Sequence, residues 1–74
     1  MLITIKLFAT FRTGRFTTET RQYPDGTTVA RIIDELRIPE QELGIILVNS
    51  RHVPSGHGLA DGDTLSLFPL LGGG

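Results

Sequence analysis

The stretch TTVARIIDELRI, residues 27–38, decides the fold of this chain. Four apolar residues recur at intervals of three and four positions, the spacing that gives a helix one apolar face: Val29, Ile32, Ile33 and Leu36. Thr28 or Thr27 is the expected N-cap and Pro39 ends the segment, which predicts one helix over about residues 28–37. A single helix of about three turns cannot cover its own apolar face. It must therefore lie across the apolar face of a sheet.

Two strands are predicted before the helix. LITIKLF (2–8) alternates, with apolar residues at positions 3, 5 and 7 and polar residues at positions 4 and 6, which is typical of a half-buried strand. RFTTETRQY (15–23) is rich in threonine and aromatic residues, which favour a second strand. The two should form a hairpin with a long loop, and PDG (24–26) should turn the chain into the helix.

Three further strands are predicted after the helix. IILV (45–48) is a continuous apolar run, which favours a strand covered on both faces. A turn at Asn49 and Ser50 leads to a short strand, RHV (51–53), and TLSLF (64–68) alternates with its two leucines inward. The expected fold is α+β: a mixed sheet of about five strands, in the order β-β-α-β-β-β, packed on one main helix.

Composition limits the possible classes of function. The chain has 74 residues and no cysteine, which indicates one domain without disulfides or thiolate metal sites. Its two histidines and scattered carboxylates do not form a zinc site, so no metal is expected. A net charge of −1 without a basic stripe argues against nucleic acid, and no apolar run approaches the ~20 residues that span a membrane. Without a recognisable signal peptide, a cytoplasmic location is expected.

Few groups could support catalysis. Histidine titrates near neutrality, but no serine or cysteine nucleophile with a supporting carboxylate accompanies His52 or His57. His57 lies between glycines in a loop where solvation is expected. Asp61 and Asp63, in the sequence LADGD, are expected to form a turn and not a catalytic pair. The chain is therefore expected to be a partner or substrate protein and not an enzyme.

Three side chains are expected on the sheet face that the helix leaves open. The alternation of the first and last strands places Phe8 and Phe68 opposite to the inward residues, and His52 faces outward too if Val53 faces the core. Clustered exposed aromatic residues usually mark a contact site, so a partner-binding surface is predicted there. The alternative is that Phe8 and Phe68 lie at strand ends, where loops bury them.

The chain ends in PLLGGG (69–74), directly after the last predicted strand. We expect a folded domain over residues 1–69 and a flexible C-terminal tail over residues 70–74. Glycine lets a tail thread a narrow channel, and the five residues beyond Pro69 reach about 17 Å when extended. Leu70 and Leu71 favour a groove on a partner that receives them. The alternative is an end that is only flexible.

The tail also offers a reactive group. A terminal carboxylate at Gly74 is ionised at neutral pH. It can attack the α-phosphate of ATP to give an acyl adenylate, which then accepts sulfur or another nucleophile. The chain has no phosphate-binding loop, so ATP would be bound and used by a partner enzyme. No cofactor is expected to bind to the chain itself.

Several segments together resemble the ubiquitin-like sulfur carriers, a family that includes the small subunit of molybdopterin synthase and the thiamine sulfur carrier. The resemblance extends over the whole chain and includes the terminal glycines. It rests on LFATFR (7–12), PDGTTVARIIDEL (24–36), LVNSRHV (47–53) and LADGDTLSLFP (59–69). It implies the ubiquitin-like β-grasp fold.

The resemblance also implies a function. An E1-like adenylyltransferase would adenylate Gly74 with ATP, and the terminus would become a thiocarboxylate that carries sulfur for cofactor biosynthesis. The second partner would be the molybdopterin synthase large subunit or thiazole synthase. Gly72 and Gly73 would line the channel beside the apolar tail residues, and Phe8, His52, Phe68 and Pro69 would contact the partners.

The branch of the family and the fate of the activated tail stay open. The LFAT start and the FP before the tail favour molybdopterin, although FPLLGGG replaces the FPPVAGG that is frequent in that branch. The thiamine (thiazole) carrier is the alternative, and the chain resembles it in size. A ubiquitin-like protein modifier conjugated through Gly74, and a non-covalent binding domain with an incidental tail, are two further hypotheses.

Overall fold

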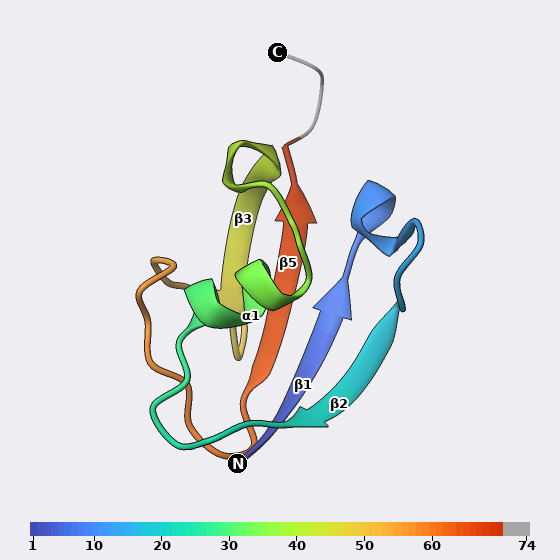
Figure 1. Ribbon diagram of the computed structural model, residues 1–74. Helices are drawn as coiled ribbons and strands as arrows, with labels where there is room; N and C mark the ends of the chain where they lie inside the picture. The colour runs from blue at the N-terminus through green and yellow to red at the C-terminus, as the bar shows by residue number, and fades with distance from the viewer. Residues whose placement is uncertain (71–74) are drawn as a thin grey trace.

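The computed structural model describes residues 1–70, and within them five strands form one mixed sheet in the order β2-β1-β5-β3-β4 (Figure 1). The elements in chain order are β1 (Leu2–Leu7), the 3₁₀ helix η1 (Ala9–Arg12), β2 (Thr18–Gln22), α1 (Val29–Glu35), the 3₁₀ helix η2 (Glu40–Glu42), β3 (Leu43–Val48), β4 (Arg51–His52) and β5 (Thr64–Pro69). The predicted order β-β-α-β-β-β is confirmed.

The centre of the sheet is the parallel pair of β1 and β5, in which Ile5 lies opposite Leu65 and Leu7 opposite Leu67. These four side chains have no exposed surface, as the alternation predicts. β2 and β3 pair antiparallel with the outer sides of this pair. The helix packs over the same face, where the core gathers: Ile3, Ile5, Leu7, Phe11, Tyr23, Val29, Ile32, Ile33, Leu36, Ile38, Val48, Leu59, Leu65 and Leu67.

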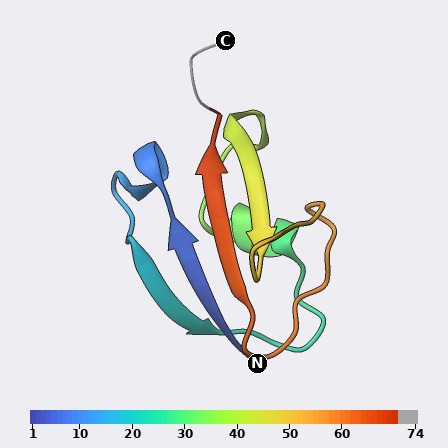
Figure 2. The ribbon, with the colours of Figure 1, turned by 180° about the vertical axis from the view of Figure 1, so that it is seen from behind.

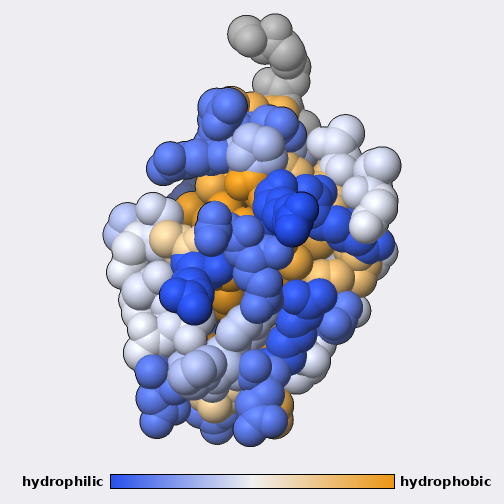
Figure 3. Space-filling model, viewed as in Figure 1, coloured by the Kyte–Doolittle hydropathy of each residue, from blue (hydrophilic) through white to orange (hydrophobic). Residues whose placement is uncertain are grey.

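Helix α1 begins where the sequence predicts and ends earlier. Thr28 is the N-cap, and its side-chain oxygen accepts a hydrogen bond of 3.3 Å from the Arg31 backbone N–H. The last helical residue is Glu35, because Arg37 turns into the left-handed region with φ of 57° before Pro39 is reached. Hydrophilic residues cover much of the helix side of the molecule, with hydrophobic residues visible between them (Figure 3).

Arg15 explains why the second strand is shorter than predicted. Its guanidinium donates hydrogen bonds to the carbonyls of Leu36 (3.0 Å), Arg37 (3.2 Å) and Phe11 (3.2 Å). Arg15 therefore links the carboxyl end of α1 to η1 through these carbonyls, and no strand begins at residue 15. The prediction of a strand over 15–23 is wrong at its beginning, because β2 starts at Thr18.

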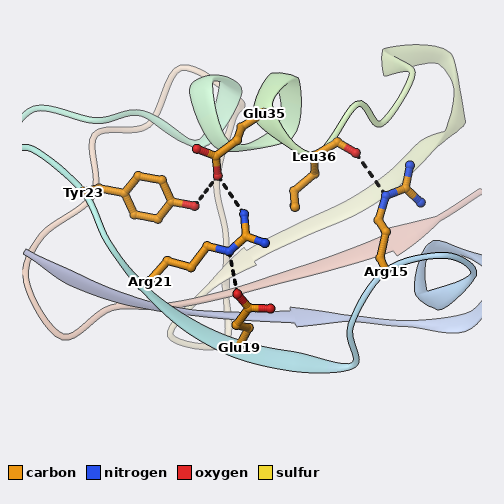
Figure 4. Close-up of polar contacts among 6 residues, drawn as sticks. All are labelled: Arg15, Glu19, Arg21, Tyr23, Glu35 and Leu36. Carbon is orange, nitrogen blue, oxygen red and sulfur yellow. Dashed lines mark hydrogen bonds and ion pairs between the residues drawn. The ribbon is translucent and has the colours of Figure 1, made fainter.

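A polar network joins β2 to α1 (Figure 4). Arg21 lies between Glu19 and Glu35 and forms an ion pair of 2.9 Å with each. The Tyr23 hydroxyl donates a hydrogen bond of 2.6 Å to Glu35, and the Arg21 guanidinium also stacks on the Phe16 ring at 5.0 Å. The network closes the side of the core between the helix and the edge strand.

The structure overturns the prediction that IILV is covered on both faces. In Figure 2, which shows the molecule from behind, the strands lie in front of α1, so the helix covers only the other face of the sheet. Ile45 is on this open face and is 41% exposed, whereas Val48 faces the helix and is buried. The apolar run is therefore not covered on both faces. It belongs to strand β3, which begins at Leu43 and has one face exposed to solvent.

Gly44 lets β3 pass close to the end of β5. The pairing between these strands shifts register between Leu43 and Ile45, and a Cβ atom on Gly44 would lie only 2.7 Å from the Pro69 carbonyl oxygen. Beside it, the Leu70 N–H donates a hydrogen bond of 2.9 Å to the Glu42 carbonyl. The close packing at Gly44 and the Leu70–Glu42 hydrogen bond therefore fix the position of the backbone where the chain leaves the sheet.

Tyr23 should make stability depend on pH in alkaline solution. Burial of the ring, and secondly its hydrogen bond to Glu35, raise the pKa of Tyr23 from 10.0 to about 12. A folded-state pKa above the unfolded one stabilises the fold below about pH 10, and this stabilisation is lost as the pH rises toward 12. We expect Tyr23→Phe to be less stable by about 1 kcal/mol at about pH 8, with a gap that shrinks above about pH 10. Urea unfolding over this range measures it; a constant gap would contradict the assignment.

Gly44→Ala should disturb the end of β5. The added methyl group would overlap the Pro69 carbonyl, so we expect a loss of about 1–3 kcal/mol in the free energy of unfolding. The Leu70 amide should also exchange faster with solvent, because its bond to Glu42 is displaced. Gly56→Ala is the matched control: no atom lies within 4 Å of the position that its methyl group would take, and a change below about 0.5 kcal/mol is expected. Equal effects of both substitutions would refute the steric explanation.

Candidate functional site

Phe8 and Phe68 form a stacked pair on the sheet face away from the helix. Phe8 follows β1 and Phe68 lies near the end of β5, and because these strands run parallel in register the two rings meet side by side. Their centroids are 4.1 Å apart and their planes differ by 10°. The prediction that both face away from the core is confirmed. Both residues are half-buried, so loops do not bury them completely as the alternative required.

Two aliphatic residues enlarge this pair. Ile45 of β3 lies opposite Phe68 in the ladder and is 41% exposed, and Leu70 follows β5 and is 63% exposed. We call Phe8, Phe68, Ile45 and Leu70 the aromatic patch. The patch adjoins a shallow, mostly apolar hollow lined by Phe8, Ala9, Gly44, Ile45, Phe68, Pro69 and Leu70. A surface of this kind at the end of a strand fits contact with another protein.

His52 shares the face but not the patch. It lies opposite Leu47 in the short strand β4, and Leu47 in turn lies opposite Ser66. His52 is therefore on the edge of the sheet, separated from β5 by β3. The structure brings Phe8 and Phe68 together, as predicted, and leaves His52 outside their contact because β4 ends before it reaches Ile45.

Two cations border the aromatic patch. The Arg12 guanidinium carbon lies 5.5 Å from the centroid of the Phe8 ring, and its Nε donates a hydrogen bond of 2.9 Å to the Leu7 carbonyl. Lys6 is exposed and lies opposite Ser66, two residues before Phe8 and therefore on the same face of the sheet. The patch thus combines an apolar centre with positive charge at its border.

Of the residues in the predicted tail, only Leu70 lies within the described residues. Pro69, which is predicted to contact a partner, is buried and belongs to β5, opposite Leu43. Leu70 is exposed, but its N–H is held by the Glu42 carbonyl. The predicted tail residues Leu71, Gly72, Gly73 and Gly74 lie outside the described residues.

The carboxylates of the LADGD turn are structural, as expected. Asp61 accepts a hydrogen bond of 2.7 Å from the Leu2 N–H, and Asp63 accepts bonds from the Asn49 side chain (2.9 Å) and the Ala60 N–H (2.8 Å). They connect the loop before β5 to β1 and to the β3–β4 turn. Within residues 1–70, no group of three or more potential ligand side chains could hold a metal ion.

Sequence reasoning missed Ile45 as a member of the site and Lys6 as a residue at its border. Ile45 could have been found by treating IILV as an alternating strand, because Val48 and Ile46 inward would place Ile45 outward. The contact of Arg12 with the Phe8 ring could not be predicted from spacing along the chain, since it depends on the turn formed by η1. No helix in the described part of the chain is long and apolar enough to cross a membrane.

Comparison with known proteins identifies the family. The model of the ThiS family matches residues 5–74. A putative molybdopterin converting factor, subunit 1, from Pyrococcus furiosus is 28% identical, with 93% of this chain and 97% of that chain covered and a TM-score of 0.77. Small archaeal modifier protein 1 from Haloferax volcanii is 25% identical, with 92% and 95% covered and a TM-score of 0.74.

A third similarity concerns the fold alone. A chain in the complex of subunits 1 and 2 of the Helicobacter pylori molybdopterin-converting factor matches with 20% identity, complete coverage of both chains and a TM-score of 0.68. No curated protein sequence matches the chain. The family model spans nearly the whole sequence, and within residues 1–70 one α-helix packed on a five-stranded mixed sheet is the ubiquitin-like β-grasp of these structures. The chain belongs to the ThiS family.

Proposed function

We propose that this protein is a sulfur carrier that is activated at Gly74. An E1-like adenylyltransferase would bind ATP, and a carboxylate oxygen of Gly74 would attack the α-phosphate, releasing pyrophosphate and leaving an acyl adenylate. Hydrosulfide supplied by the partner system would then displace AMP and leave a terminal thiocarboxylate. The single observation that carries this proposal is the aromatic patch at the base of the tail in a chain of the ThiS family. Because activation consumes ATP, we expect the protein to act in the cytoplasm.

The aromatic patch and Leu70, the first residue of the tail, would together determine where Gly74 is placed in the docked partner. The apolar surface around Phe8 and Phe68 would dock on the partner, while Leu70 starts the tail from a backbone held by Glu42. Four residues beyond Leu70 can reach about 13 Å when extended. That length is sufficient for Gly74 to enter the active site of a docked neighbour, and the absence of side chains on glycine suits a narrow channel. His52 and Pro69 would contribute at the margin of the docked surface.

Molybdopterin biosynthesis is the proposed destination of the sulfur. The similarity to a protein described as molybdopterin converting factor, subunit 1, supports it, and so do LFAT and FP in this sequence. The second partner would then be the molybdopterin synthase large subunit. Thiamine biosynthesis, with thiazole synthase as the partner, is the alternative within the same chemistry. In both cases the chain is the substrate of partner enzymes and catalyses no step itself.

A ubiquitin-like modifier is the second candidate function. The similarity to small archaeal modifier protein 1 favours it, because the same acyl adenylate could transfer Gly74 to the amine of a lysine on another protein. AMP would leave and an isopeptide bond would form. Covalent adducts in a cell extract supplied with ATP would support this function, and a carrier that acquires sulfur but forms no adducts would argue against it.

Sulfur loading should appear as a change in mass. We expect the protein, incubated with ATP, an activating enzyme and a sulfur donor, to gain the mass that corresponds to replacement of one oxygen by sulfur. Deletion of Gly74 should abolish the gain and leave the unfolding midpoint unchanged, since Gly74 lies beyond the domain of residues 1–69. Mass spectrometry of the intact protein decides between the outcomes. An unchanged mass, under conditions in which a control carrier reacts, would reject the sulfur-carrier proposal.

Phe68→Ala should weaken binding to the activating enzyme. Loss of a central aromatic hot spot typically costs about 2 kcal/mol or more in an interface, so we expect the dissociation constant to rise about tenfold or more. Leu2→Ala is the matched control, because Leu2 is also exposed (53%) but lies at the opposite end of β1. Calorimetric titration of both variants measures the difference. Equal affinities for the two variants would show that the patch is not the docking surface.

A further inference from the structure

Strand β2 is an edge of the sheet, and its outward backbone groups follow from the pairing with β1. The Leu7 N–H donates to the Thr17 carbonyl (2.9 Å) and the Tyr23 N–H to the Met1 carbonyl (2.8 Å). In an antiparallel ladder the direction alternates, so residues 17, 19, 21 and 23 bond to β1. The N–H and C=O groups of Thr18, Thr20 and Gln22 therefore point away from the sheet, and all three residues are exposed.

We propose that a second copy of this chain pairs with β2, antiparallel and about a twofold axis at Thr20. The sequence of the strand, TETRQ, supports this partner because it is complementary to itself in charge. With Thr20 opposite Thr20 of the second copy, Thr18 lies opposite Gln22, and the outward groups of these residues form about six backbone hydrogen bonds. Glu19 then lies opposite Arg21 of the second copy, and Arg21 opposite its Glu19.

The charges select this register over its neighbours. Shifting the axis to residue 19 still aligns outward groups, but it places Glu19 opposite Glu19. Shifting it to residue 21 places Arg21 opposite Arg21. Like charges directly opposite each other destabilise a strand pair, whereas opposite charges stabilise it. Only the register centred on Thr20 pairs unlike charges and uses all three outward residues.

The proposed dimer leaves the candidate functional site open. A twofold axis perpendicular to the sheet would join the two sheets edge to edge. Because α1 lies on one face of the sheet (Figure 1), both α1 helices would then lie on the same face of the dimer. The aromatic patch lies on the opposite face, around the ends of β1, β5 and β3 and not on β2. Each copy contributes only five residues, far less than the interface of about 1,600 Å² in stable complexes. The dimer should therefore form at millimolar concentration and weaken as salt screens the charge pairs.

Thr20→Pro tests the pairing with little cost to the fold. Proline lacks the N–H that points outward at this position, and an edge strand tolerates proline where the N–H faces solvent. Thr20→Val is the matched control, because it keeps the N–H and the branched side chain. By sedimentation equilibrium up to millimolar concentration, we expect the mean mass of the native protein and of Thr20→Val to rise clearly above the monomer mass of 8.1 kDa as the concentration increases. Thr20→Pro should associate at least tenfold more weakly.

Hydrogen exchange in the native protein gives a test that needs no variant. The amides of Glu19 and Arg21 should be protected at every concentration because they bond to β1. Those of Thr18, Thr20 and Gln22 should become protected only as the concentration rises. A mass of one chain at all concentrations, or exchange of these three amides that is independent of concentration, would overturn the proposal. If exchange of these amides does not depend on concentration but slows when another protein is added, the β2 edge binds that protein and not a second copy. That result would also overturn the proposal.

Discussion

The parallel pairing of β1 with β5 is the constraint on which the rest of the structure depends. It joins the beginning and the end of the described chain in the middle of the sheet, and its inward residues are among those with no exposed surface. Their neighbours on both sides satisfy the backbone N–H and C=O groups that burial would otherwise leave unpaired. Because the same register that puts Leu7 beside Leu67 inside also puts Phe8 beside Phe68 outside, core packing determines the aromatic patch.

The hydrophobic core is small for an independently stable domain, and charged side chains around it join segments of the chain that are distant in sequence. Without cysteine, the chain has no disulfide to restrain its loops. Arg15 instead binds three backbone carbonyls at the end of α1, and Arg21 joins Glu19 of the strand to Glu35 of the helix. Hydrogen bonds from a guanidinium are stronger than those between neutral groups, so one arginine can hold two segments distant in sequence. Asp61 and Asp63 act in the same way on the loop before β5.

Docking and delivery would be linked through the end of β5. Phe68 belongs to the patch, Pro69 is the last residue of the strand, and Leu70 is bonded to Glu42. The surface that would bind a partner and the point from which the tail departs therefore both include residues at the end of β5. Gly44 permits this arrangement because no other residue would leave room for the Pro69 carbonyl. In a carrier, such a link would direct the terminus into a docked active site without a separate hinge.

The sequence by itself determined the order of elements, the inward and outward faces of β1 and β5, and the N-cap of α1. These features depend on local periodicity and on Thr28, which can be recognised without neighbours. Only the tertiary structure decided the start of β2, the exposure of Ile45 and the separation of His52 from the patch. An apolar run has the same pattern whether one face or two are covered, and which face stays open depends on how many helices the chain supplies. The contacts of Arg12 and Arg15 were equally beyond the sequence, because long side chains reach partners that are set by packing and not by spacing along the chain.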